Sequence, residues 1–99
     1  MKLELRQTGK FAEWFRDLRD RRASERIAQR LARVQYGLFG DVKPVGGGVS
    51  ELRIDYGPGY RVYFTRRGST VILLLCGGDE GSQARDIEAA RAMAKEIAE

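Results

Sequence analysis

Two arginines and a tyrosine in one short segment are the residues of this sequence best suited to chemistry on an anion. The stretch ELRIDYGPGYRVYFT places two alternating runs around a Gly-Pro-Gly break, a pattern typical of a β-hairpin. If residues 55–59 form the loop, Arg53 faces Arg61 and Glu51 faces Tyr63. Opposed like charges disfavour a hairpin by up to about 1 kcal/mol, so a neighbouring acid neutralises the arginines or they await an anion. Arginine binds phosphate through two parallel hydrogen bonds, which makes phosphate the anion of choice.

The sequence restricts the other kinds of chemistry. Histidine is absent and Cys76 is the one cysteine, which excludes a histidine general base, a Ser-His-Asp triad and the commonest zinc ligand. We therefore expect no metal and no cofactor, and any reaction must depend on Arg, Lys, Glu, Asp or Tyr. Cys76 itself is expected at the edge of the core rather than as a nucleophile.

The composition describes a globular chain of one domain, residues 1–99. Hydrophobic residues make up 42% and charged residues 32%, which is typical of folded proteins. The longest apolar run, VILLLC, is too short for a membrane span, and the start MKLELRQ lacks the pattern of a signal peptide. A cytoplasmic location without membrane contact is therefore expected. The net charge of +4 favours a partner that is nucleic acid or an acidic protein.

Apolar periodicity predicts the helices that must position the hairpin. Residues 2–6 read as a strand, after which Thr8 can cap a first helix with an apolar face. Ser24 can cap a second helix, whose apolar stripe extends to Leu38. Ser82 can open a last helix near the end of the chain.

The remaining segments alternate with a period of two. Residues 49–54, 60–66 and 70–76 read as strands, whereas the glycine-rich segment 41–48 reads as a loop. The order is therefore β-α-α-β-β-β-α, an α+β domain with a largely antiparallel, twisted sheet. The helices are expected on one face of that sheet, and the arginines on the other, open face. Arg61 is accordingly expected to be mostly solvated.

Half of the chain also resembles a known family. Residues 46–94 are similar to the phage-derived, HigB-like addiction module killer proteins of the RelE/ParE toxin superfamily, which belong to type II toxin–antitoxin systems. The resemblance lies in ELR, GPGYRVYF, LLLCGGD and the SQ and DI of SQARDI, with the family's earlier F..W...L pattern at Phe11, Trp14 and Leu18. Relatives commonly carry lysine where Glu80 stands, which reverses a charge near the expected RNA path.

This resemblance implies a RelE-like fold, a cognate antitoxin encoded nearby that often carries a helix-turn-helix, and an action on ribosome and mRNA. The leading hypothesis is a ribosome-dependent endoribonuclease in which the 2′-hydroxyl attacks the adjacent phosphate. One alternative is a ParE-like inhibitor of DNA gyrase without chemistry of its own. Another is a degenerate toxin that retains only antitoxin binding. Fold alone does not decide among them.

RNA cleavage of this type assigns roles to the hairpin residues. It needs a proton acceptor, a cation over the phosphorane oxygens and a donor for the leaving oxygen. Arg61 would be that cation and Arg53 a second phosphate contact. Tyr63 could stack a base or donate a proton, and Glu51 could accept one. The alternative is a sheet surface on which Glu51 and Asp55 pair with the arginines.

Further candidates lie outside the hairpin. Asp79 follows the last predicted strand, residues 70–76, where it could be a functional carboxylate or a helix cap. Lys43 precedes the triple glycine and could reach RNA or remain solvated. The second predicted helix carries basic side chains at spacings of four, four and three, which could contact ribosomal RNA or form a solvated face; these are Arg22, Arg26, Arg30 and Arg33.

Overall fold

The computed structural model describes residues 2–97 and confirms an α+β domain with a largely antiparallel sheet. Thr8 caps the first helix as predicted, because its side-chain oxygen accepts a hydrogen bond from the backbone N of Phe11 at 3.0 Å. The elements are β1 (Glu4–Gln7), α1 (Gly9–Arg16), α2 (Arg21–Val34), β2 (Val42–Gly46), β3 (Val49–Ile54), β4 (Tyr60–Arg67), β5 (Val71–Gly78), a 3-10 turn (Glu80–Ser82) and α3 (Gln83–Ile97).

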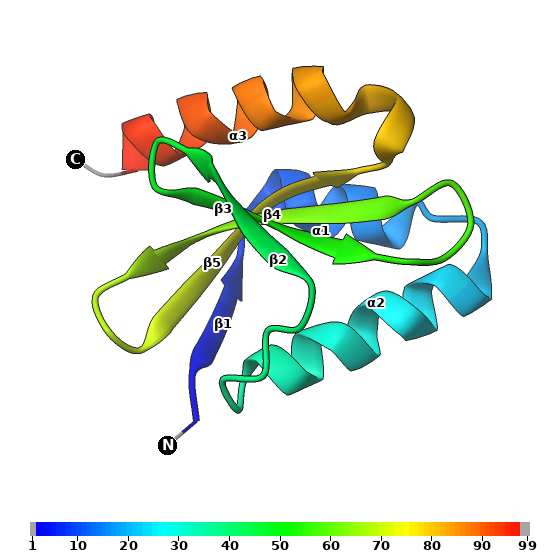
Figure 1. Ribbon diagram of the computed structural model, residues 1–99, viewed down its shortest axis with the longest axis horizontal. Coiled ribbons are helices and arrows are strands. Elements are labelled where there is room, and N and C mark those ends of the chain that lie inside the picture. The colour runs from blue at the N-terminus through cyan, green and yellow to red at the C-terminus, as the bar shows by residue number, and fades with distance from the viewer. Residues whose placement is uncertain (1, 98–99) are drawn as a thin grey trace.

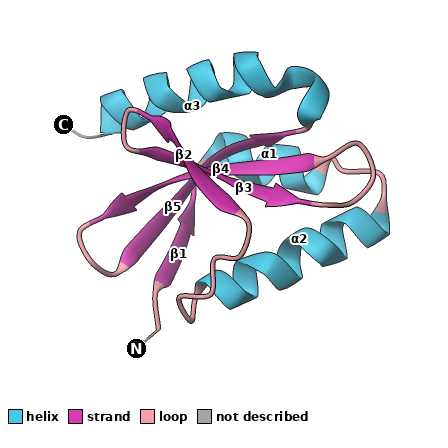
Figure 2. Ribbon diagram, in the orientation of Figure 1, coloured by secondary structure: helices cyan, strands magenta, loops and turns pink. Residues whose placement is uncertain are grey.

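The five strands form one sheet in the order β1-β5-β4-β3-β2. β1 runs parallel to β5, and the other neighbours are antiparallel. The register of the central hairpin is the predicted one, since Arg53 pairs with Arg61 and Glu51 with Tyr63 across β3 and β4. Figures 1 and 2 show the strands crossing between α3 along the top of the view and α2 at the lower right.

The segment predicted as a loop contains a strand. β2 forms an edge of the sheet, where Pro44 costs no ladder hydrogen bond. Its partner β3 follows after a turn at Gly47 and Gly48, both of which have positive φ. Loop prediction failed here because five residues with a proline and flanking glycines carry almost no alternation of their own. Pairing with β3 supplies the order.

The second helix begins and ends earlier than predicted. Asp20, rather than Ser24, is its cap, because the Asp20 carboxylate accepts hydrogen bonds from the backbone N of Arg22 and Ala23. The helix ends at Val34, and Leu38 lies beyond it with 62% of its surface exposed. An apolar residue at the right spacing is therefore not part of the helical stripe once the helix has ended.

The helices cover both faces of the sheet, which corrects the expectation of a single covered face. α1 and α2 contribute Phe11 and Ile27 to a core with Leu52 and Phe64 of the sheet. α3 packs on the opposite face, where Ala90 and Ala94 join a second cluster of residues: Val49, Tyr63, Leu75 and Cys76. β5 makes this possible because its apolar residues point to both faces, as in strands buried on two sides.

The glycines at the end of β5 serve close packing rather than a turn. Gly77 and Gly78 both lie in the strand. A Cβ at Gly77 would overlap the ring of Trp14, and one at Gly78 would overlap the carboxylate of Asp86. The bare backbone thus lets α1 approach one face of the strand and α3 the other.

Candidate functional site

A buried carboxylate, Glu51, lies at the centre of the predicted site. It is fully buried at 0% exposure. Its Oε2 accepts hydrogen bonds from the hydroxyl of Tyr63 at 2.9 Å and from Nε2 of Gln83 at 2.9 Å. Nε of Arg53 donates to Oε1 at 2.9 Å, and Nε of Arg61 lies 3.5 Å from Oε2. Two strands and the start of α3 therefore meet at one carboxylate.

These partners keep Glu51 ionised. Burial alone would raise the pKa of Glu51, but hydrogen bonds from Arg53, Gln83 and Tyr63 and the charge of Arg61 outweigh it and lower the pKa. Both carboxylate oxygens are occupied by donors. The geometry therefore favours the second interpretation of Glu51, a partner for the arginines, over a proton acceptor in the reaction.

Arg53 and Arg61 share this one carboxylate. Side-chain exposure is 33% for Arg53 and 12% for Arg61, so the expectation of a mostly solvated Arg61 is wrong. The reason is that α3 covers the face that was expected to be open. Nη1 of Arg61 donates to the carbonyl of Gly59 at 3.2 Å, whereas its buried Nε has no hydrogen-bond partner among the described residues. With one acid between two bases, the cluster keeps a net positive charge.

Tyr63 positions Glu51 from within the core in this structure. Its ring is fully buried, in contact with the cluster under α3. Burial, and then the hydrogen bond to Glu51, raise the pKa of Tyr63. Stacking of Tyr63 on a base would require movement of α3, whereas its hydrogen bond to Glu51 needs none.

Asp79 is engaged as a cap. Its side chain accepts a hydrogen bond from the backbone N of Gly81 at 2.9 Å, and a reciprocal contact with Ser82 completes a capping box. Ser82 therefore belongs to the turn before α3 rather than opening the helix alone. Of the two roles considered for Asp79, the geometry favours the cap.

Lys43 lies on a strand rather than a loop. It pairs with Glu51 across β2 and β3, and opposed residues of an antiparallel pair share a face. Lys43 is exposed, so it adds a positive charge at the rim of the buried cluster. Cys76, also on this face, is buried, and burial raises the pKa of its thiol to about 11. This agrees with a place in the core.

The four arginines of α2 do not form one uniform surface. Arg22, Arg26 and Arg33 are exposed, and the guanidinium of Arg26 lies 4.8 Å from the ring centroid of Tyr56. Arg30 is different. Its Nη2 donates to the carbonyls of Phe39 at 2.9 Å and Asp41 at 3.4 Å, and its Nη1 donates to the carbonyl of Arg53.

Two residues that the sequence analysis did not assign complete the site. Gln83 holds Glu51 from the first turn of α3, and the only available signal was its place in the SQARDI motif. Gly59 lies at the junction of Arg61 and Glu80, because a Cβ placed there would be 3.4 Å from Nη1 of Arg61 and 3.6 Å from Oε2 of Glu80. Nothing in the turn sequence indicates that contact.

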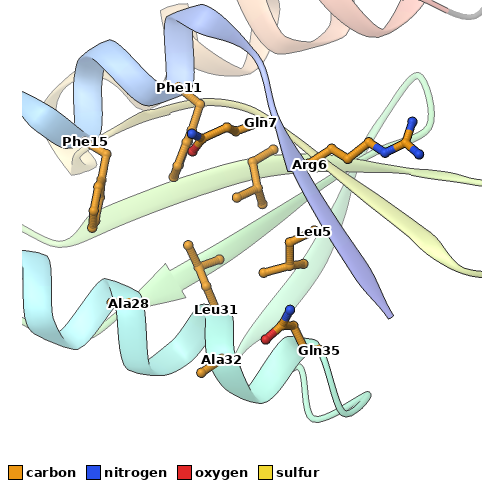
Figure 3. A pocket seen from close by; sticks show the side chains of 10 residues that line it. Leu5, Arg6, Gln7, Phe11, Phe15, Ala28, Leu31, Ala32 and Gln35 are labelled. Atoms are coloured by element: carbon orange, nitrogen blue, oxygen red, sulfur yellow. The ribbon is translucent and has the colours of Figure 1, made fainter. Parts of the chain in front are cut away.

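An apolar groove lies apart from this cluster, on the face covered by α1 and α2. It has a volume of about 690 Å³, and Figure 3 shows Leu5, Phe11, Phe15 and Leu31 around it. It contains none of the residues predicted to bind phosphate. Across residues 2–97, no helix is long and apolar enough to span a membrane, and no group of three or more potential metal ligands occurs.

Comparisons with known proteins agree with this description. No family model matches the chain. An uncharacterized protein of Haemophilus influenzae is 42% identical over 97 residues, and the alignment covers 98% of each chain. This chain belongs to the same family as that protein. A free-state structure of the E. coli toxin RelE, with two arginines replaced by alanine, matches with a TM-score of 0.75. It covers 94% of this chain and 97% of the other at 16% identity, so the match shows a RelE-like fold.

In this RelE-like domain, Arg30→Ala is expected to lower the free energy of unfolding by about 2 to 3 kcal/mol, because three backbone carbonyls lose a charged donor. Burial lowers the pKa of Arg30, which is consistent with an enclosed guanidinium. Urea denaturation measures the change. The control is Arg22→Ala on the exposed side of the same helix, which should alter stability by less than about 0.5 kcal/mol. Equal effects of the two variants would contradict a stabilising role for the hydrogen bonds of Arg30 to the three carbonyls.

The lowered pKa of Glu51 predicts a loss of stability in acid. A carboxyl group whose folded pKa is depressed stabilises the fold above its unfolded pKa, about 4.3, and this contribution disappears as pH falls through the lower folded value. Urea midpoints of the wild type should therefore fall between pH 5 and pH 3. Glu51→Gln lacks this titration, so its midpoint should fall less over the same window. Parallel curves for both proteins would refute the ionised state of Glu51.

Proposed function

We propose that this protein is a HigB-like toxin of a type II toxin–antitoxin system that cleaves messenger RNA on the ribosome. The observation that carries the proposal is the pair Arg53 and Arg61. Both arginines pair with one buried carboxylate, that of Glu51, so the three side chains together have a net positive charge. The RelE-like fold adds support, because a solved protein with this fold is a toxin. The cytoplasm is the compartment in which such a toxin would act.

The arrangement suits phosphoryl chemistry. Attack of a 2′-hydroxyl on the adjacent phosphate builds negative charge on the phosphorane oxygens, and fixed cations stabilise that charge without reorganisation. Glu51 accepts a hydrogen bond from Nε of Arg53 and forms a 3.5 Å ion pair with Arg61, whose Nη1 donates to the carbonyl of Gly59. The orientation of both guanidinium groups is therefore set before RNA arrives. Lys43 at the rim, with Arg22, Arg26 and Arg33 on α2, would bind backbone phosphates of the message or the ribosome.

The test is cleavage of a defined message by purified protein on translating ribosomes, in the presence of EDTA. We expect cuts whose 5′ products carry a cyclic phosphate and whose 3′ products carry a 5′-hydroxyl. A supercoiling assay with DNA gyrase runs in parallel. Inhibition of gyrase without any RNA cut would replace the proposal by the ParE-like alternative.

The proposed partner is an antitoxin encoded beside the gene. Induced expression of the protein alone should arrest growth, and co-expression of the neighbouring reading frame should restore it. Growth unaffected by the protein alone, with a stable complex still formed, would indicate a degenerate toxin that only binds its antitoxin.

A further inference from the structure

A nuclease of the proposed kind needs a proton acceptor, and the carboxylates assigned so far are engaged elsewhere. Glu51 accepts from Tyr63 and Gln83 and pairs with both arginines. Asp79 caps the turn before α3. Asp86 accepts a hydrogen bond from Ser82 and lies against Gly78. None of the three presents a free carboxylate beside Arg61.

Glu80 is differently placed. It is exposed, and its carboxylate has no hydrogen bond or ion pair within the described part of the chain, residues 2–97. A Cβ added to Gly59 would lie 3.4 Å from Nη1 of Arg61, 3.4 Å from Cβ of Glu80 and 3.6 Å from Oε2 of Glu80. The guanidinium and the carboxylate thus flank the same glycine.

The backbone fixes this juxtaposition. The N–H of Glu80 donates to the carbonyl of Pro58 at 3.3 Å, which joins the turn before α3 to the hairpin loop. The carbonyl of Gly59 accepts from Nη1 of Arg61 at 3.2 Å. Gly59 has a φ of +80° and no side chain, so the space between the two charged groups stays open.

We propose that Glu80 is the catalytic proton acceptor of the reaction, an inference that rests on the proposed function. With the phosphate oxygens on Arg61, the Glu80 carboxylate lies within reach of the neighbouring 2′-hydroxyl. It takes the hydroxyl proton while the 2′-oxygen bonds to phosphorus. The bond from phosphorus to the 5′-oxygen then breaks, and that oxygen takes a proton from water. Glu80 returns its proton to solvent, so protons and bonds balance.

The experiment compares the wild type with Glu80→Gln on translating ribosomes. We expect kcat to fall by about a hundredfold to ten-thousandfold. KM should stay level or decrease, because a negative charge near the phosphates is gone. Glu80→Asp keeps a carboxylate and should retain part of the rate. The control is Glu88→Gln, an exposed substitution on α3, which should cut at the wild-type rate.

The outcomes separate this inference from the proposed function. If the wild type cuts RNA and Glu80→Gln cuts it equally fast or faster, Glu80 is not the proton acceptor and the assignment is overturned. If the wild type cuts no RNA, the proposed function fails and the assignment fails with it. Thermal melting should show the same midpoint for Glu80→Gln and the wild type, since the carboxylate has no partner to lose. Glu80→Gln should bind a message with a 2′-deoxy scissile nucleotide as tightly as the wild type or more tightly. A lower rate of cleavage would then come from the chemical step and not from weaker binding of RNA.

Discussion

Replacing Glu51 by alanine is expected to lower the free energy of unfolding by about 3 to 5 kcal/mol, because it removes one member of a buried charge cluster and leaves the others unpaired. The hydroxyl of Tyr63 and the amide of Gln83 would lose their acceptor in the same step. Equilibrium unfolding in urea measures the loss. Glu4→Ala, which removes an exposed ion pair with Arg6, should leave the midpoint nearly unchanged.

A double variant identifies the interaction responsible. If the destabilisation comes from uncompensated charge, Glu51→Ala combined with Arg61→Ala should cost less than the two single effects together. Strict additivity would mean that the two side chains contribute independently, and the cluster would then owe its stability to packing.

Replacing Arg61 by alanine is expected to lower the rate of RNA cleavage by about two to three powers of ten, the cost of removing a fixed donor at a developing negative charge. Lysine should restore part of the rate, since it keeps the charge but loses the planar fork. A solvated Arg61 would leave stability unchanged on removal. With only 12% of the side chain exposed and Glu51 beside it, Arg61→Ala should also melt at a lower temperature than the wild type.

Cleavage by Arg61→Ala must therefore be measured at a temperature at which the variant is folded. Arg67→Ala, on the exposed end of the same strand, is the matched control and should cut normally. A folded Arg61→Ala variant that cuts at the wild-type rate would show that this arginine only neutralises Glu51.

The local pattern of the sequence was sufficient for the class of fold, the α1 cap and the register of the central hairpin. Apolar and polar residues alternate with a period of two in both strands of the hairpin. A five-residue loop between the strands then leaves one way to pair them, with Glu51 opposite Tyr63. The pairing of Arg53 with Arg61 could be predicted for the same reason. These features depend on residues close together in the chain, whose preferences are visible without the rest of the molecule.

What covers each face of the sheet was decided only by the tertiary structure. Alternation predicts which side chains share a face, but it does not indicate whether that face meets solvent or a helix. α3 packs beside Tyr63 and brings Gln83 to Glu51. Glu51 and Tyr63, which alternation places on the face expected to be open, are therefore buried. The hydrogen bond from the N–H of Glu80 to the carbonyl of Pro58 likewise joins segments that are distant in the sequence. It exists because β4 and β5 bring the hairpin loop and the turn before α3 to one end of the sheet.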